Sequence, residues 1–255
     1  MNVYWLEQTA ADVPAENQWL SPAEILSLGR MRFAKRRNDW RLGRWTAKRA
    51  LAAHLNLRCD RLALAKIEIR AAASGAPEAF LFNQAAPVTI SLSHRAGIAM
   101  CAVALPGAGI GCDLEVIEPR SNAFIADYLT AHEQALVEQT LDEQRALPVT
   151  LLWSAKESAL KALHVGLRLD TNSMDVSFTD GLPLYADQSR ADLSPVPMRD
   201  IDPDGWRPLR VRHSDEQAFC GWWRRENGMV RTLLRALPLR SLLQSFSISP
   251  GNGSL

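Results

Sequence analysis

The heptapeptide G-I-G-C-D-L-E at residues 109–115 constrains this chain more than any other stretch. It follows an apolar run, residues 98–105, that ends at a Pro-Gly pair, so one buried strand is predicted to end there and another to begin near Ile110. Side chains on a strand alternate between faces, which places Asp113 and Glu115 on one face about 7 Å apart. Two carboxylates beside glycines, which let a ligand or another backbone approach, form an oxygen site suited to Mg²⁺. The alternative is a solvated strand edge that carries two acids.

A second segment, W-S-A-K-E-S-A-L-K-A at residues 153–162, carries charges at helical spacing. On a helix, Trp153, Glu157 and Lys161 are spaced at i, i+4 and i+8 and therefore form one stripe. The structural interpretation is an ordinary Glu–Lys pair on a helix surface. The functional interpretation is a third carboxylate for the metal, followed one turn later by an ammonium that can hold a phosphate.

Together, the two segments resemble the signature pair of the 4′-phosphopantetheinyl transferases of the larger, two-lobed type. The pair comprises an acid-x-acid strand, a spacer and the motif W-x-x-K-E-x-x-x-K, and a weaker likeness extends from about Phe33 to Asp175. The resemblance implies an α+β fold of two similar lobes, related by a pseudo-twofold, with a cofactor cleft between them. It also implies an enzyme that moves the 4′-phosphopantetheine arm of coenzyme A to a serine of an acyl or peptidyl carrier protein. The implied reaction depends on Mg²⁺ and releases 3′,5′-ADP.

The resemblance assigns roles to the acids and lysines of both segments. It implies that Asp113, Glu115 and Glu157 hold Mg²⁺, either directly or through water. Lys156 and Lys161 are expected to hold phosphate oxygens of coenzyme A. Glu157, or a water that it holds, is our candidate for the base that removes the serine proton, with Lys161 also at the reacting centre. We expect Asp113 and Glu157 to face solvent in the cleft.

A basic block occupies residues 30–49, with nine Lys or Arg residues and a single acid, Asp39. At helical spacing, one face of this block is lined by basic side chains, namely Arg37, Arg41, Arg44 and Lys48. Such a face is commonly only solvated, and a nucleic-acid surface is a further alternative. The resemblance implies that this helix meets the 3′-phosphate of coenzyme A, and arginine suits that task because its planar fork grips two phosphate oxygens. We expect Arg37 to contribute first, followed by Arg36 and Arg44.

The segment after the basic block alternates as in a strand over residues 62–69 and runs into the turn S-G-A-P. Many relatives carry a lysine between this glycine and proline, where this chain has Ala76. The lysine contact with the cofactor is therefore either missing here or supplied by Arg70, just upstream of the turn.

A further strand is predicted over residues 88–92, and it runs into the motif S-L-S-H. A histidine at the end of a strand is most often structural, which is the alternative to a functional role. Within the resemblance, Ser93 and His94 match a family motif that contacts the cofactor phosphates. The serine hydroxyl and a ring N–H of the histidine are both suitable donors for phosphate oxygens.

The order of strands and helices occurs roughly twice along the chain, with no accompanying repeat of individual residues. Two capping boxes, S-P-A-E at residues 21–24 and T-A-H-E at residues 130–133, each predict the start of a helix. We assign residues 1–108 to an N-terminal α+β lobe, 109–237 to a C-terminal α+β lobe and 238–255 to a flexible tail. Strands of a second sheet are predicted at residues 176–178, 182–185, 209–211 and 218–223.

Composition argues against several classes of protein. The net charge of +1 argues against a surface that binds polyanions as a whole, and the four cysteines lack zinc spacing. No apolar stretch approaches the length of about 18 residues that crosses a membrane, and the N-terminus does not resemble a leader. We therefore expect a cytoplasmic protein that binds coenzyme A and a carrier protein, without nucleic acid or membrane. The resemblance implies a monomer.

Two other functions stay open at this point. A Mg²⁺-dependent phosphohydrolase could use the same acids with water as the nucleophile, and it would need no carrier protein. A non-catalytic module could instead use the basic helix to bind an acidic protein partner. The first alternative leaves the S-L-S-H motif without a role.

Overall fold

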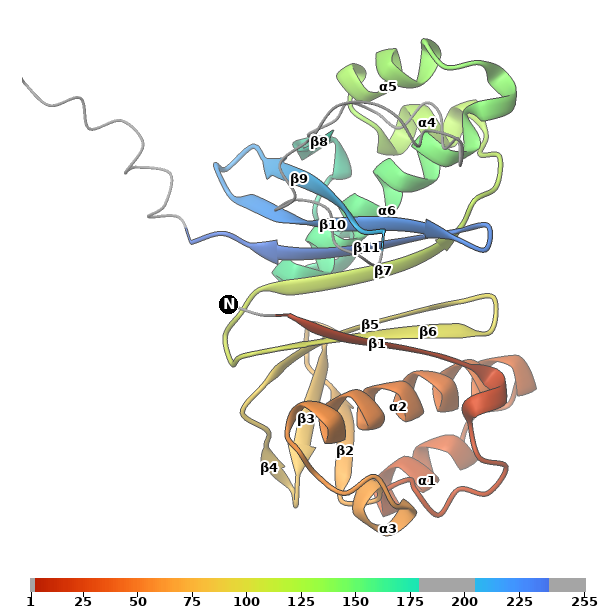
Figure 1. The fold of residues 1–255 in the computed structure, drawn as a ribbon, viewed down its shortest axis with the longest axis vertical. Coiled ribbons are helices and arrows are strands. Elements are labelled where there is room, and N and C mark those ends of the chain that lie inside the picture. Colours follow the sequence, from red (N-terminus) through yellow and green to blue (C-terminus); the bar gives the residue numbers. More distant parts are fainter. Residues whose placement is uncertain (1–2, 179–204, 239–255) are drawn as a thin grey trace, which may run out of the picture.

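The computed structural model describes residues 3–178 and 205–238, which form two stacked α+β lobes (Figure 1). This mixed architecture confirms the predicted fold class. The N-terminal lobe contains β1 (Tyr4–Thr9), η1 (Ala10–Asp12), α1 (Pro22–Gly29), α2 (Ala34–His54), α3 (Arg61–Leu64), β2 (Ile67–Ala71), β3 (Pro77–Leu81), β4 (Gln84–Ala85), β5 (Thr89–Arg95) and β6 (Ile98–Ala104). The C-terminal lobe contains β7 (Ile110–Val116), α4 (Asn122–Tyr128), α5 (Ala131–Glu138), η2 (Asp142–Gln144), α6 (Ala146–Leu163), η3 (Gly166–Arg168), η4 (Thr171–Ser173), β8 (Met174–Phe178), β9 (Arg207–His213), β10 (Ala218–Glu226) and β11 (Met229–Ala236).

Two antiparallel sheets face each other in the middle of the molecule, and a long helix covers the outer side of each (Figure 1). The sheet β1-β6-β5 with helix α2 belongs to the N-terminal lobe, and the sheet β7-β11-β10-β9-β8 with helix α6 belongs to the C-terminal lobe. A smaller sheet, β2-β3-β4, completes the N-terminal lobe. Met100, Ile110 and Leu233 are buried together where the two facing sheets meet. The lobes therefore share an apolar core at their interface.

The two predicted capping boxes start helices where the sequence places them. Ser21 accepts a hydrogen bond from the backbone of Glu24, whose carboxylate accepts one in return at the start of α1. Thr130 and Glu133 repeat this arrangement at the start of α5. Each box satisfies backbone N–H groups that a helix leaves without partners. None of the helices in the described part of the chain combines the length and apolarity needed to span a membrane.

Several predicted elements need correction. The predicted strand over residues 62–69 begins only at Ile67, because Asp60 accepts a hydrogen bond from the backbone of Ala63 and caps the short helix α3. The sequence patterns do not predict β11, although Asn227 and Gly228 mark it. Both take positive φ angles, 50° and 71°, in the tight turn that joins β10 to β11. The predicted strand over 182–185 and the tail from residue 239 lie outside the described residues.

The two lobes also repeat individual residues, so the sequence interpretation that found no such repeat is wrong. Helix α2 contains W-T-A-K at residues 45–48, and helix α6 contains W-S-A-K at residues 153–156. The segment W-L-S-P-A-E at residues 19–24 leads into α1, and Y-L-T-A-H-E at 128–133 leads into α5. These short matches lie in otherwise dissimilar sequence. They become recognisable once the fold shows which helices correspond.

A buried ion pair connects the lobes at β1 and β11. Arg231 is 1% exposed and donates to both carboxylate oxygens of Glu7, at 2.5 and 2.7 Å. Removing one partner of such a pair leaves the other charge uncompensated, although Glu7 keeps some contact with solvent. We therefore expect Arg231→Met to lower the free energy of unfolding by about 2 kcal/mol in urea denaturation. Arg225→Met, at an exposed position of the same hairpin, is the control, and an equal loss in both variants would contradict this expectation.

Candidate active site

Strand β7 and helix α6 are packed so closely that a glycine is required between them. A Cβ atom placed on Gly111 would lie 1.8 Å from the carbonyl oxygen of Ser158 in α6. This glycine therefore permits the close approach of a backbone, one of the two uses that the sequence predicts. The contact brings the α6 residues Glu157 and Lys161 to the part of β7 that carries Asp113.

Asp113 is the centre of the polar contacts at this junction. Its Oδ1 accepts hydrogen bonds from Lys161 Nζ at 2.8 Å and from Ser93 Oγ at 2.9 Å, so α6, β7 and β5 meet at one carboxylate. Its Oδ2 is buried and has no hydrogen-bond partner among the described residues. Such an oxygen is a candidate cation ligand. Asp113 is 4% exposed, so the expectation that it faces solvent is wrong.

The two glutamates of the predicted site lie in the electrostatic field of Asp113. Burial is the main cause that raises the pKa of Glu115 above its usual value, and the charge of Asp113 is the second cause. The same causes in the same order raise the pKa of Glu157, and Lys161 lowers it in part. The three acids therefore repel one another when ionised, and a cation held among them would relieve this repulsion.

The side chain of Glu115 is also held by two arginines that the sequence interpretation does not include. Its Oε2 lies 3.3 Å from Arg120 Nη2 and 3.6 Å from Arg95 Nε. Both arginines closely follow a motif in the sequence, Arg95 after S-L-S-H and Arg120 after the acid-x-acid strand. That proximity is the signal that could have identified them. They balance part of the negative charge at this end of β7.

Asp113, Glu115 and Glu157 are the predicted ligands of a divalent ion. The described part of the chain contains no group of three or more His, Cys, Asp or Glu side chains already gathered in a metal-binding geometry. The unpartnered Oδ2 of Asp113 and the raised pKa values of Glu115 and Glu157 nevertheless fit a hard cation that prefers oxygen ligands. We therefore retain Asp113, Glu115 and Glu157 as proposed ligands.

A cavity of about 770 Å³ opens in the N-terminal lobe, between α2, the β2–β3 turn and the end of β5. Four residues predicted to bind a cofactor line it, namely Arg36, Arg44, Arg70 and His94. The lining residues among the described parts of the chain all come from this lobe, whereas the sequence predicts a cleft lined by both lobes. It adjoins the acids through the end of β5, where His94 follows the serine bonded to Asp113.

Aromatic rings hold two of the cavity arginines in place. The guanidinium of Arg44 lies 4.3 Å from the ring centroid of Trp40, and that of Arg70 lies 3.9 Å from the ring centroid of Phe80. Arg70 also donates through Nε to Glu68 at 2.8 Å. Stacking fixes the plane of a guanidinium while leaving N–H groups at its edge for an anion. Sequence reasoning did not identify Trp40 and Phe80 as part of the site.

The face of α2 that lines the cavity differs from the predicted one. Arg36, Trp40 and Arg44 lie at intervals of four residues and turn toward the cavity. Arg37 is exposed and is absent from the lining. Arg41 instead donates to backbone carbonyls of the segment before α1. The structure therefore favours Arg36 and Arg44 over Arg37, which the sequence interpretation places first.

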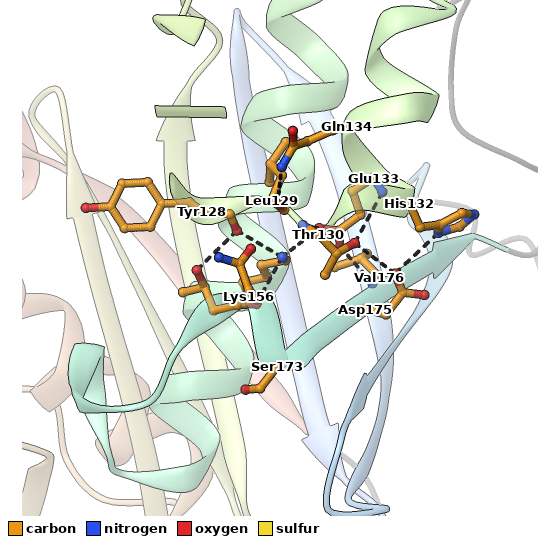
Figure 2. Close-up of polar contacts among 12 residues, drawn as sticks. Tyr128, Leu129, Thr130, His132, Glu133, Gln134, Lys156, Ser173, Asp175 and Val176 are labelled. Atoms are coloured by element: carbon orange, nitrogen blue, oxygen red, sulfur yellow. Dashed lines mark hydrogen bonds and ion pairs between the residues drawn. The ribbon is translucent and has the colours of Figure 1, made fainter. Parts of the chain in front are cut away.

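Lys156 is not among the residues that line the cavity. It lies in the interior of the C-terminal lobe, beside Glu133 (Figure 2). Its ammonium is fully buried, forms an ion pair with Glu133 at 2.6 Å and donates to the carbonyl oxygens of Tyr128 and Thr171 at 2.9 and 3.0 Å. All three of its hydrogen atoms are thereby used. In this arrangement the Lys156 ammonium has no N–H group left for the phosphate that the sequence predicts it to hold. The next residue of α6, Glu157, faces the acids instead.

The two predicted residues of the S-L-S-H motif lie in different parts of the site, Ser93 at the acids and His94 at the cavity. Ser93 is buried and donates to Asp113 instead of lining the cavity. His94 is exposed at the rim of the cavity, where desolvation by the surrounding residues lowers its pKa and the charge of Asp39 opposes that effect. A lowered pKa leaves the imidazole neutral near pH 7, so one ring nitrogen donates a hydrogen bond and the other accepts one.

Comparison with protein families identifies the region that carries the acids. A model of the 4′-phosphopantetheinyl transferase superfamily matches residues 109–203. This region belongs to that superfamily. The match begins at the first glycine of the heptapeptide and includes the three acids and Lys161, whereas the cavity residues of the N-terminal lobe precede it. The chain is therefore a transferase.

A solved structure also resembles the transferase. The crystal structure of Helicobacter pylori holo-[acyl-carrier-protein] synthase in complex with coenzyme A is 21% identical, with a TM-score of 0.32. The similarity covers 41% of this chain and 99% of that chain. No curated protein matches the transferase in sequence.

Proposed function

We propose that the transferase moves the 4′-phosphopantetheine arm of coenzyme A to a serine hydroxyl of an acyl or peptidyl carrier protein. The reaction depends on Mg²⁺ and releases 3′,5′-ADP. The observation that carries this proposal is the hydrogen bond of 2.9 Å between Ser93 and Asp113. It joins the strand that ends at the arginine-lined cavity to the strand with the acid-x-acid motif. Coenzyme A carries a 3′-phosphate and a 5′-diphosphate on one ribose, so it can place one phosphate group in each half of the site.

The proposed enzyme is a monomer of the larger, two-lobed type, and it acts in the cytoplasm. Two lobes supply the site, because the cavity belongs to one lobe and the acids belong to the other. The four cysteines are free thiols, which suits a reducing compartment. The N-terminal lobe binds coenzyme A in this proposal, and the C-terminal lobe carries the reaction at its diphosphate.

The cavity binds the phosphates of coenzyme A in this proposal. Arg36, Arg44 and Arg70 bring three guanidinium groups to one hollow. Hydrogen bonds between charged groups are about twice as strong as neutral ones, and a fork of donors fits phosphate oxygens. The volume of about 770 Å³ falls in the range of small-molecule sites. His94 provides a neutral donor at the end of the cavity nearest to Asp113.

Asp113, Glu115 and Glu157 are the residues that hold Mg²⁺ in this proposal. When bound, the ion supplies charge stabilisation and alignment for the diphosphate. Lys161 supplies a further positive charge. Burial alone would lower the pKa of Lys161, but the charges of Asp113, Cys112 and Glu157 and the hydrogen bond to Asp113 together outweigh this effect and raise it. The ammonium therefore stays protonated and can donate to an oxygen of the leaving phosphate.

Glu157 is the proposed acceptor of the serine proton, either directly or through a water that it holds. Burial and the charge of Asp113 raise its pKa, which makes it a stronger base than an ordinary glutamate. As the serine oxygen bonds to phosphorus, its proton passes to Glu157 and the bond to the phosphate of 3′,5′-ADP breaks. Lys161, one helical turn away, is placed to stabilise that leaving group.

Mass spectrometry of a carrier protein tests this function. The carrier is incubated with coenzyme A, MgCl₂ and the full chain, and the expected product carries one phosphopantetheine arm on serine. EDTA is expected to abolish the modification, and excess MgCl₂ to restore it. Cleavage of coenzyme A without a carrier would instead favour the phosphohydrolase. Failure to modify fatty-acid, polyketide and peptide carriers alike would contradict the proposal.

Arg44 and Arg37 form a matched pair for testing the cavity. We expect Arg44→Met to raise the dissociation constant of coenzyme A about tenfold, because it removes a charge-assisted hydrogen bond. Arg37→Met, on the same helix but outside the lining, should change it by less than about twofold. Isothermal titration calorimetry measures both values. Equal losses in the two variants would show that general positive charge, and not the cavity, binds the cofactor.

A further inference from the structure

A buried lysine anchors helix α2 in the N-terminal lobe. Lys48 forms an ion pair with Glu24 at 2.5 Å and donates to the carbonyl oxygen of Trp19 at 2.9 Å. The other carboxylate oxygen of Glu24 accepts from the backbone of Ile69 on β2 at 3.1 Å. The same glutamate completes the capping box with Ser21. Glu24 and Lys48, which we call the N-terminal pair, therefore join α1, α2 and β2.

A second pair repeats this arrangement in the C-terminal lobe (Figure 2). Lys156 of α6 forms an ion pair with Glu133 at 2.6 Å and donates to the carbonyl oxygen of Tyr128 at 2.9 Å. The other oxygen of Glu133 accepts from the backbone of Val176 on β8 at 3.0 Å. Glu133 also completes the capping box with Thr130. Glu133 and Lys156, the C-terminal pair, therefore join α5, α6 and β8 through the same set of contacts.

The positions that differ between the two helices are informative. Residues 45–48 and 153–156 are almost identical, and they end at the anchoring lysine in each lobe. The next position is Arg49 in α2 and Glu157 in α6, and four residues later Ala53 stands where α6 has Lys161. The repeat thus preserves the anchor, whereas the chemistry proposed for α6 is absent from α2. A lysine needed for phosphate chemistry alone would not be expected in both copies.

We propose that these are positioning pairs, and that each fixes the rotation and register of one long helix against its lobe. The C-terminal pair places the next residue, Glu157, and Lys161 at the acids of β7. The N-terminal pair places Arg44, one turn before its lysine, at the cavity. These effects on the acids and the cavity rest on the proposed function. The anchoring of each helix does not depend on that function, because it follows from contacts in the structure.

The reason for a charged anchor lies in the cost of a wrong register. The four side chains of the two pairs are at most 3% exposed. A buried ammonium that loses its carboxylate and carbonyl partners is strongly unfavourable, whereas apolar side chains tolerate small shifts. Rotating either helix by one residue would leave such a charge unpaired. The pair therefore discriminates among helix positions, even where it contributes little net stability.

Steady-state kinetics of two matched double variants tests the inference. E133Q/K156M and E24Q/K48M each remove both charges, so neither leaves an unpaired buried ion. The C-terminal variant is expected to lower kcat about 10²-fold with little change in KM for coenzyme A, because it displaces groups at the reacting centre. The N-terminal variant is expected to raise that KM about tenfold with a smaller change in kcat. A merely structural role would change both parameters alike in the two variants, and that outcome would overturn the inference.

Amide hydrogen exchange provides a readout that does not depend on activity. Faster exchange is expected in α6 and β8 of the C-terminal variant, and in α2 and β2 of the N-terminal variant. Unchanged exchange in those elements would overturn the positioning role. If a double variant does not fold, Glu133→Asp or Glu24→Asp alone, which shortens the side chain but keeps its charge, is measured in the same two experiments. A wild-type chain without transfer activity would contradict the proposed function, while the exchange experiment would still decide whether the pairs fix their helices.

Discussion

Asp113→Asn is expected to lower kcat/KM for phosphopantetheine transfer by about 10³-fold while the chain stays folded. Asparagine keeps an oxygen that can accept the hydrogen bonds of Ser93 and Lys161. It removes the negative charge and places an amide nitrogen where Oδ2 lies unpartnered, so a metal ligand is lost at almost constant shape. Steady-state kinetics at several Mg²⁺ concentrations measures the loss, and circular dichroism checks the fold.

Asp127→Asn is the matched control for this experiment, because Asp127 is exposed on α4 in the same lobe. It should retain the wild-type rate. Near wild-type transfer by the Asp113→Asn variant at saturating Mg²⁺ would contradict the metal assignment. Loss of activity together with loss of the folded state would instead show that the buried contacts of Asp113 are structural.

Glu157→Gln is expected to lower kcat by about 10³-fold, because it removes both a proposed ligand and the proposed base. The wild-type rate should fall as the pH drops through the pKa of Glu157, since the protonated form cannot accept the serine proton. Because burial and Asp113 raise that pKa in the metal-free site, the fall should lie at higher pH when Mg²⁺ is limiting, and it should move to lower pH as added Mg²⁺ offsets the charge of Asp113. The residual activity of the variant should lack this dependence. Profiles of kcat against pH measure both effects.

Glu138→Gln, at an exposed position on α5, is the control for that substitution and should keep the wild-type profile. If Glu157→Gln reduces the rate but leaves the acidic fall in place, another group removes the serine proton. Weaker Mg²⁺ dependence without a change in the profile would then restrict Glu157 to metal binding.

Local sequence patterns predicted the elements on which the site depends. Alternation placed Asp113 and Glu115 on one face of β7, and helical spacing placed Glu157 and Lys161 on one stripe of α6. Capping boxes located the starts of α1 and α5. These signals succeed because backbone geometry alone determines which neighbouring residues share a face.

The same signals failed where burial decides what a charged residue does. The motif around Lys156 predicts a phosphate ligand, yet the lysine side chain points into the lobe toward Glu133. Arg36 and Arg37 are adjacent in the sequence, and only Arg36 lines the cavity. Helical spacing gives relative angles around the axis, but it does not give the rotation of the helix against its sheet. That rotation depends on contacts with residues far away in the chain.

The amino-acid sequence by itself determined which residue types can carry phosphate and metal chemistry, and how they are spaced along β7 and α6. The tertiary structure alone decided that Ser93 of the other lobe bonds to Asp113 and that the arginines form one cavity beside it. It also decided that Lys48 and Lys156 are anchors. The physical reason is that these outcomes depend on which charges become buried together, and burial is a property of segments that meet only in the folded chain.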